Sequence, residues 1–513
     1  MQRLAQKSII PFALIGLVAV FLRLLPGERI IDDAYITYRY AENILAGQGF
    51  VYNPGERVLG TTTPLYTLLL AGLAALVGSR DFAAISVTLN ALSGGAACVV
   101  LALLTERLSG RPRLGWAAGL LWALAPMSVT FAIGGMETPI YILLMLATMA
   151  TYLWGHLSWT AALGALALLT RPDALLFLAP LALDAGLRCA RSGKWRALLR
   201  PAAIAAGPLL AWTAFSLAYF GSPLTNSVTA KSVAYVLPPT QAVVRFWQHY
   251  STPFMEHLFF ERLPGGVGLY WPLPGLVIYL SLHAIGVLSF GRKDSRAWAI
   301  GAYPLLYFAA FAIANPLIFR WYLAPPLPVY IASILGGLAQ TTDDISVRRG
   351  AHVMAALVGL FSLSLLGAWE LHPDHGPARP APKMAWFELE LLYEQVAQEL
   401  APTLSADSVI AAGDIGAVGY YSGARVLDTL GLVSPEAVPY YPLPPEQVAT
   451  NYAIAADLIL DQRPQFIVML EVYGRRTLLR DSRFHAAYSL VQRIDTDIYG
   501  SEGMLVYKTN KGG

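Results

Sequence analysis

Two adjacent carboxylates, Asp32 and Asp33, follow the first apolar segment of the chain. If this segment spans a membrane, the two carboxylates lie at its boundary, where they are costly to desolvate, so their presence there calls for a reason. One reason is structural, because Asp is favoured at the start of a helix as a cap and as a partner of the helix dipole. The other is chemical, because a carboxylate can accept the proton of an attacking hydroxyl group. These two residues alone leave both interpretations open.

Four basic residues, Arg39, Arg171, Lys231 and Arg320, could bind a negatively charged group of a ligand. Each has a structural alternative. Arg171 and Arg320 could snorkel at helix ends, and Lys231 could be a solvated loop residue. Arg39 could pair with the acids beside it.

Other acids fit supporting roles. Glu137 and Asp173 are expected to pair with such cations, and Asp414 begins a turn, where Asp is usually structural. Asp32 or Asp33 could also hold a divalent cation, although no ligand-spacing motif demands one. The metal question therefore stays open.

The composition indicates which elements must position these side chains. Of 513 residues, 56% are hydrophobic and 13% are charged, against about 25% charged in soluble proteins. These values indicate a polytopic membrane protein and exclude a cytosolic enzyme. The net charge of +3 offers no basic field for nucleic acid. The two cysteines, Cys98 and Cys189, support neither a disulfide framework nor a zinc site.

About eleven apolar segments are long enough to span a bilayer. They lie at roughly 8–25, 82–104, 114–133, 139–155, 157–170, 172–187, 201–220, 271–290, 297–314, 322–340 and 351–369. Segment 64–78 is shorter and is better suited to an interfacial or re-entrant helix. If it does not cross, the basic loops at 107–113, 188–200, 292–296 and 348–349 all face the cytoplasm, as the positive-inside rule requires. We therefore predict a plasma-membrane protein with a cytoplasmic N-terminus.

This topology places the chemically interesting residues on the outer side. The first external loop is 26–80, and residues 1–369 form the transmembrane domain. Residues 370–513 form an extracytoplasmic domain that begins with a Pro- and His-rich linker. An amphipathic helix at 386–400, short strands at 408–412 and 465–470, and a helix end at 457–460 predict a small α/β domain.

The sequence resembles a known family, the bacterial GT-C membrane glycosyltransferases, and within it the subgroup of the mycobacterial terminal arabinofuranosyltransferase AftB. The first loop carries the most specific motifs, which are Asp32-Asp33-Ala34-Tyr35-Ile36, Tyr38-Arg39-Tyr40-Ala41, Gly47-Gln48-Gly49, Asn53-Pro54-Gly55-Glu56-Arg57-Val58 and Gly60-Thr61-Thr62. Weaker motifs follow in order, which are Gly135-Met136-Glu137-Thr138, Thr170-Arg171-Pro172-Asp173, Gly221-Ser222-Pro223-Leu224-Thr225-Asn226 with Ala230-Lys231-Ser232, Arg320-Trp321-Tyr322-Leu323-Ala324-Pro325, Gly413-Asp414-Ile415-Gly416-Ala417-Val418-Gly419-Tyr420-Tyr421 and Asp428-Thr429-Leu430-Gly431-Leu432.

The resemblance implies a GT-C-like fold and an inverting transferase that takes a sugar from a polyprenyl-phosphate donor. The acceptor would be an extracytoplasmic glycan or glycoprotein. The sugar would be a pentose or a hexose, and the nearest subgroup implies arabinofuranose. An acid of the first loop would be the base, and we favour Asp32 over Asp33. Arg39, Arg171, Lys231 and Arg320 would bind the donor phosphate. The residues expected to contact substrate are Tyr35, Tyr38, Glu137, Asn226 and Tyr322.

A membrane transporter or lipid-linked glycan flippase is the alternative function. Transporters place polar groups and broken helices near the midplane, often in two related halves. Here the spans carry almost no charge at mid-depth and no half repeats the other. The transferase hypothesis is therefore preferred.

Overall fold

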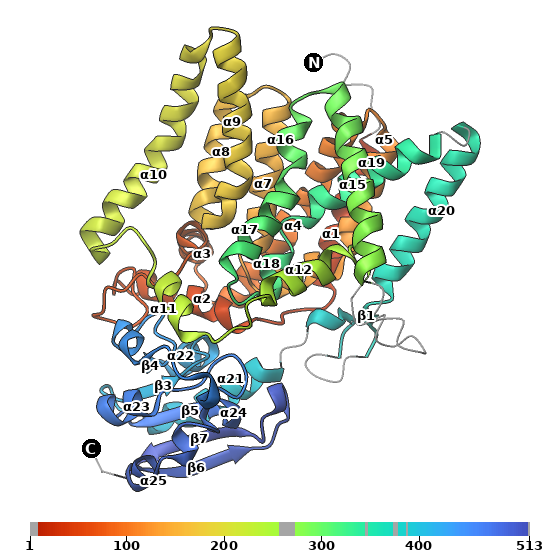
Figure 1. The fold of residues 1–513 in the computed structure, drawn as a ribbon. Helices are drawn as coiled ribbons and strands as arrows, with labels where there is room; N and C mark the ends of the chain where they lie inside the picture. Colours follow the sequence, from red (N-terminus) through yellow and green to blue (C-terminus); the bar gives the residue numbers. More distant parts are fainter. Residues whose placement is uncertain (1–8, 256–271, 344–346, 373–377, 386–387, 511–513) are drawn as a thin grey trace. The chain divides into compact units, whose positions relative to one another are not determined.

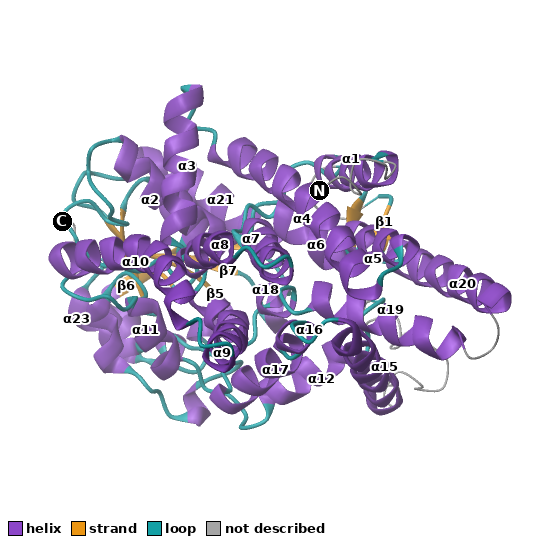
Figure 2. Cartoon of the chain, turned by 90° about the horizontal axis from the view of Figure 1, so that it is seen from above, coloured by secondary structure: helices purple, strands orange, loops and turns teal. Residues whose placement is uncertain are grey.

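The computed structural model describes residues 9–255, 272–343, 347–372, 378–385 and 388–510. Helices make up most of this chain (Figure 2). The chain divides into two compact units, and each is described by itself. Unit 1 comprises 1–29, 86–210 and 240–386, and unit 2 comprises 30–85, 211–239 and 387–513. Most of the predicted first external loop, 26–80, and most of the C-terminal tail, 370–513, therefore belong to the same unit.

Unit 1 is helical, and α4 and α10 each also contribute residues to unit 2 (Figure 1). Its main helices are α1 (Ile10–Leu24), α4 (Phe82–Ser109), α5 (Pro112–Leu124), α6 (Pro126–Ile133), α7 (Thr138–Leu153), α8 (Leu157–Thr170), α9 (Leu175–Arg191), α10 (Leu199–Phe220), α12 (Gln241–Tyr250), α15 (Pro272–Lys293), α16 (Ala297–Gly301), α17 (Tyr303–Ala314), α18 (Arg320–Leu323), α19 (Leu327–Asp343) and α20 (Val347–Leu366). Two short strands, β1 (Trp369–Glu370) and β2 (Ala381–Pro382), pair antiparallel.

Helices occupy all of the predicted apolar segments, but not every one of these helices is long enough to cross a membrane by itself. In the described residues, five helical stretches are long and apolar enough to cross a membrane, namely Phe82–Ser109, Trp195–Phe220, Leu273–Lys293, Ala297–Ala314 and Arg320–Thr342. The predicted span 114–133 is two helices, α5 and α6, bent by 50°. The bend falls at Ala125, which is extended because the next residue is Pro126. The multi-pass helical architecture is confirmed, whereas the number of crossings, about eleven, stays a prediction.

Unit 2 combines helices of the first loop with the α/β tail (Figure 1). Its helices are α2 (Asp32–Leu45), α3 (Pro64–Val77), α11 (Asn226–Ala234), α21 (Glu388–Leu400), α22 (Gly416–Ser422), α23 (Ala456–Gln462), α24 (Glu471–Gly474) and α25 (Ser482–Ala487). Its strands are β3 (Val409–Ala412), β4 (Arg425–Asp428), β5 (Phe466–Leu470), β6 (Tyr488–Ile494) and β7 (Met504–Thr509). The predicted small α/β domain is confirmed.

The sheet of unit 2 has the strand order β4-β3-β5-β7-β6. Strands β4, β3 and β5 are parallel, with Ala411 opposite both Leu427 and Ile467. Strand β7 is antiparallel to β5 and β6. Parallel strands present their carboxyl ends at one edge, where α/β proteins commonly bind ligands. The turn that starts at Gly413 lies at that edge, directly after β3.

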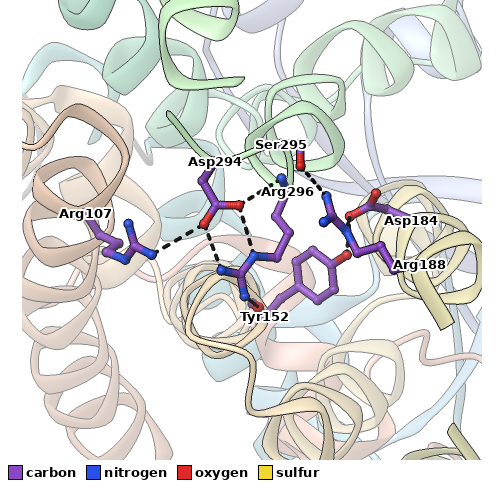
Figure 3. A network of polar contacts seen from close by, with 7 residues as sticks. All are labelled: Arg107, Tyr152, Asp184, Arg188, Asp294, Ser295 and Arg296. Carbon is purple, nitrogen blue, oxygen red and sulfur yellow. Dashed lines mark hydrogen bonds and ion pairs between the residues drawn. The ribbon is translucent and has the colours of Figure 1, made fainter. Parts of the chain in front are cut away.

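Three of the basic loops of unit 1, 107–113, 188–200 and 292–296, contribute residues to one polar network (Figure 3). Asp294 pairs with Arg296 at 2.8 Å and with Arg107 at 3.4 Å. Arg188 pairs with Asp184 at 2.8 Å and donates to the Ser295 hydroxyl at 2.9 Å. Ends of α4, α9 and α15 therefore lie together, as loops on a common side of the membrane would.

Cysteine labelling would test the sidedness. In a cysteine-free background, Arg80→Cys is expected to react with a membrane-impermeant thiol reagent in intact cells. Arg113→Cys is expected to react only after permeabilisation, because it lies in a basic loop predicted to be cytoplasmic. Both positions are exposed, so access to the reagent does not limit the comparison. The opposite labelling pattern would overturn the predicted orientation.

Candidate functional site

The two adjacent carboxylates form the first turn of α2, in unit 2. Ile31 before them is extended, with ψ at 144°, so the helix begins at Asp32. Acidic residues in a first turn interact favourably with the exposed N–H groups there. The following turns are buried, and they fix how α2 presents its two carboxylates.

Asp32 is held by the tail. Its Oδ2 accepts a hydrogen bond from the Gly416 N–H at 2.9 Å, and its Oδ1 accepts one from the Ala417 N–H at 2.8 Å. The approach is so close that a Cβ on Gly416 would lie 1.8 Å from the Asp32 carbonyl oxygen. Glycine is therefore required at 416, and both oxygens of Asp32 are engaged by backbone donors.

Asp33 differs from Asp32 in its partners. Within the described residues, the Asp33 carboxylate has no hydrogen-bond partner and no ion pair, and it is only half-buried. Three other carboxylates interact with it electrostatically, those of Asp32, Glu390 and Asp414. A free, partly solvated carboxylate beside other acids is suited to accept a proton.

The neighbouring acids have raised pKa values. Desolvation raises the pKa of Glu390 to about 7, and the charges of Asp414 and Asp33 contribute. Desolvation and the charge of Asp33 raise the pKa of Asp414 to about 6, although a hydrogen bond from the Tyr393 hydroxyl at 2.8 Å acts against this shift. Desolvation and the charge of Asp414 raise the pKa of Asp32 well above its usual range. Asp32, Glu390 and Asp414 therefore hold protons more readily than ordinary carboxylates do.

Arg39 is engaged by backbone carbonyls. Its Nε donates to the Tyr52 carbonyl at 2.9 Å, and its Nη groups donate to the carbonyls of Gly419 and Ala424. The guanidinium also lies 4.5 Å from the Tyr52 ring centroid, and the residue is buried. These contacts tie the first loop to the tail and leave Arg39 poorly placed to meet a phosphate.

The two tyrosines predicted to contact substrate lie in one aromatic cluster. Tyr38 is fully buried and stacks on Phe82 at 5.9 Å between ring centroids. The Tyr35 hydroxyl lies 3.1 Å from that of Tyr421, and its ring contacts that of Tyr420 at 5.4 Å. These contacts pack α2 against α22.

Helix α11 carries Asn226 and Lys231. Asn226 Nδ2 donates to the carbonyls of Gly431 at 2.5 Å and Leu432 at 3.1 Å, so the tail fixes the start of this helix. Asp428 supports the same turn by accepting hydrogen bonds from nearby backbone N–H groups, including that of Val433 at 3.0 Å. Lys231 is half-buried on the last turn of α11.

Unit 1 contains a second cluster, around Arg171. Its guanidinium pairs with Glu137 at 3.0 Å and with both oxygens of Asp173 at 3.0 Å. The Tyr307 hydroxyl donates to Asp173 at 2.9 Å, and Tyr322 places its ring 5.1 Å from the guanidinium. Glu137 and Asp173 are thus partners of a buried cation, as expected from the sequence.

Arg320, also in unit 1, has a different environment. It begins α18 and is exposed, and no ion pair or hydrogen bond engages it among the described residues. Its sequence neighbours Phe319 and Trp321 stack with ring centroids 4.6 Å apart. An exposed guanidinium without such partners keeps its donors available for a ligand.

Sequence reasoning missed Glu390 and Tyr393. Both lie on α21, within the segment predicted as an amphipathic helix, and nothing in their spacing marks them out. Only the packing of α21 and α22 brings them to Asp414. Among the described residues, no group of three or more His, Cys, Asp or Glu could hold a metal ion.

Comparisons with known proteins identify relatives of parts of this chain. A family model described as a domain of unknown function, DUF8728, matches residues 384–507. A curated relative, the terminal β-(1→2)-arabinofuranosyltransferase of Mycobacterium tuberculosis, is 30% identical over 233 residues. This match covers 40% of the chain and 35% of the relative, so the chain spans about a third of that protein's length.

Two solved structures share the fold over most of the chain. ArnT from Cupriavidus metallidurans in the apo state matches with a TM-score of 0.57 and 14% identity, covering 97% of each chain. The oligosaccharyltransferase AglB from Archaeoglobus fulgidus, in complex with an inhibitory peptide and a dolichol-phosphate, matches with a TM-score of 0.53 and 13% identity. It covers 90% of this chain and 69% of that one. The predicted likeness to GT-C membrane glycosyltransferases is confirmed, and the chain has their fold.

Proposed function

We propose that this chain, which shares the GT-C fold, transfers a sugar from a polyprenyl-phosphate donor to an extracytoplasmic glycan or glycoprotein. Related folds support this class of donor, because ArnT has been solved with undecaprenyl phosphate bound and AglB with a dolichol-phosphate. Arabinofuranose is the proposed sugar, because the curated relative is an arabinofuranosyltransferase.

Asp33 is the proposed base, and this assignment rests on one contrast. Both oxygens of Asp32 accept backbone hydrogen bonds, whereas the Asp33 carboxylate has no such partner in the described chain. A base needs a lone pair that can reach the acceptor hydroxyl. Asp32, which the sequence favoured, is the proposed anchor that holds the start of α2 against the tail.

The proposed reaction is a single displacement with inversion. The acceptor hydroxyl transfers its proton to Asp33 as its oxygen bonds to the anomeric carbon. The bond from that carbon to the donor phosphate oxygen breaks, and polyprenyl phosphate departs with the electron pair. Cations that meet this phosphate in the transition state would lower the barrier.

A direct assay tests the proposed function. The purified full-length chain is incubated with a panel of polyprenyl-phosphate sugars and candidate acceptors, and free polyprenyl phosphate is measured by mass spectrometry. We expect release that depends on both donor and acceptor, with the arabinofuranosyl donor preferred. Movement of intact donor across reconstituted vesicles, without release, would instead support a transporter or flippase.

Measurements of donor affinity test which of the candidate cations bind the donor phosphate. Arg320→Ala is expected to weaken donor binding about ten- to a hundredfold, since a hydrogen bond to a charged group contributes roughly 1.5–3 kcal/mol. Lys231→Ala should weaken binding similarly if α11 also contacts the donor. Arg463→Ala, which removes an exposed cation of the tail, is the matched control and should leave affinity unchanged. Unchanged donor affinity in both the Arg320 and the Lys231 variant would contradict phosphate binding by these residues and would favour structural roles for them.

A further inference from the structure

A basic segment, residues 191–200, runs from the end of α9 into the first turn of α10 and has no part in the proposed chemistry. It contains no acidic residue and four basic ones, which are Arg191, Lys194, Arg196 and Arg200. All four are exposed, and among the described residues none of their side chains forms an ion pair or a hydrogen bond. Figure 1 shows the segment as the turn that joins the two helices at their common end.

Cations close to the basic segment are neutralised by acids of the chain itself. In neighbouring loops, Arg107 and Arg296 both pair with Asp294. Arg188, just before the segment, pairs with Asp184. The basic segment instead carries four positive charges that no acid of the described chain compensates. Its charge is therefore available to a partner outside the chain.

The second half of the basic segment is amphipathic. A short 3-10 helix, η2 (Trp195–Leu198), continues into α10, and together they form the helical stretch Trp195–Phe220. Residues four apart on a helix lie on one face, so Trp195 and Leu199 form an apolar pair beside the basic pair Arg196 and Arg200. Trp195 and Leu199 are each 58% exposed. An exposed apolar pair next to exposed cations is typical of a helix end at a membrane interface.

The position of the basic pair along this helix fits the same interface. The stretch Trp195–Phe220 is long and apolar enough to cross a membrane. In α10, all of which the structure describes, Ser216 is the only buried residue, so the rest of the helix is left for lipid to cover. The apolar part begins at Pro201, directly after Arg200. The cations therefore lie where the phosphate groups of a bilayer would be.

We propose that the basic segment binds the phosphate groups of anionic phospholipids through its four exposed cations, while Trp195 and Leu199 insert at the level of the upper lipid chains. Guanidinium and ammonium groups form charge-assisted hydrogen bonds to phosphate oxygens. Clusters of Lys and Arg beside a membrane helix attract lipids of net negative charge. The bound lipids anchor the α9–α10 turn in the headgroup layer.

Local lipid enrichment tests this proposal. The full-length protein, with Cys98 and Cys189 replaced by Ala, carries a donor fluorophore at Ser192→Cys and is reconstituted in phosphatidylcholine nanodiscs. An acceptor fluorophore is attached to the acyl chain of either phosphatidylglycerol or phosphatidylcholine, at equal mole fraction. Energy transfer is expected to report an enrichment of phosphatidylglycerol of about fivefold, which is the effect of one cation near an anionic surface, or more. Arg196→Gln with Arg200→Gln should reduce it to twofold or less.

The controls separate lipid binding from general electrostatics. Arg463→Gln with Arg480→Gln removes two exposed cations of unit 2 and should retain the wild-type enrichment. Raising sodium chloride from 0.1 to 1 M should abolish the wild-type enrichment, which needs no variant, because it shortens the screening length from about 10 to 3 Å. Equal transfer to the two lipids in the wild type at 0.1 M salt would overturn the proposal. Displacement by inorganic phosphate beyond that by chloride at equal ionic strength would also overturn it, in favour of a free phosphate.

Discussion

Asp33→Asn is expected to lower turnover by about 10²–10⁴-fold, the usual cost of losing a general base. Asparagine keeps the shape of the side chain and removes its capacity to accept the proton. Because Asp33 makes no hydrogen bond within the described chain, melting temperature and donor affinity should stay close to the wild-type values. Single-turnover release of polyprenyl phosphate from bound donor measures the chemical step directly.

Asp32→Asn provides the contrast. The Gly416 and Ala417 N–H groups each donate to a different oxygen of Asp32, but an asparagine side chain has only one acceptor oxygen. This variant loses one of the two hydrogen bonds and should therefore lose stability as well as activity. Asp407→Asn, at an exposed carboxylate of the tail, controls for the loss of one charge in unit 2. If the Asp32 and Asp33 variants both transferred sugar at wild-type rates, the first loop would not supply the base.

Arg171→Met is expected to destabilise the protein by on the order of 3–5 kcal/mol, because it leaves Glu137 and Asp173 buried without their cation. The side chains of Arg171 and Glu137 are 4% and 8% exposed, so water cannot compensate the loss. The measurement is the melting temperature of the full-length protein in detergent.

Arg483→Met is the matched control for this prediction. Arg483 also pairs with two carboxylates, Asp457 and Asp481, but its side chain is 63% exposed. Its loss should leave the melting temperature nearly unchanged, since exposed ion pairs contribute little. The triple variant Glu137→Gln, Arg171→Met and Asp173→Asn should recover much of the lost stability, because it leaves no charge stranded. Wild-type stability of Arg171→Met alone would contradict the structural role of this cluster.

Local patterns were enough to predict the helices and part of the tail. Apolar stretches of spanning length predicted the membrane helices, and short buried runs predicted β3 and β5. Hydrophobic periodicity carries this information because burial follows it residue by residue. The break between α5 and α6 was missed, although Pro126 was its visible cause.

The sequence by itself determined the membrane class, the presence of a small α/β tail and the chemical interest of Asp32 and Asp33. Only the tertiary structure distinguished these two carboxylates, because their difference depends on the N–H groups of Gly416 and Ala417, almost four hundred residues further along the chain. The same holds for Arg39, whose partners in the tail are carbonyls that no sequence pattern reveals. Neighbours in sequence share composition and local conformation, but hydrogen-bond partners from distant segments are set by packing, and they decide which polar group stays free to react.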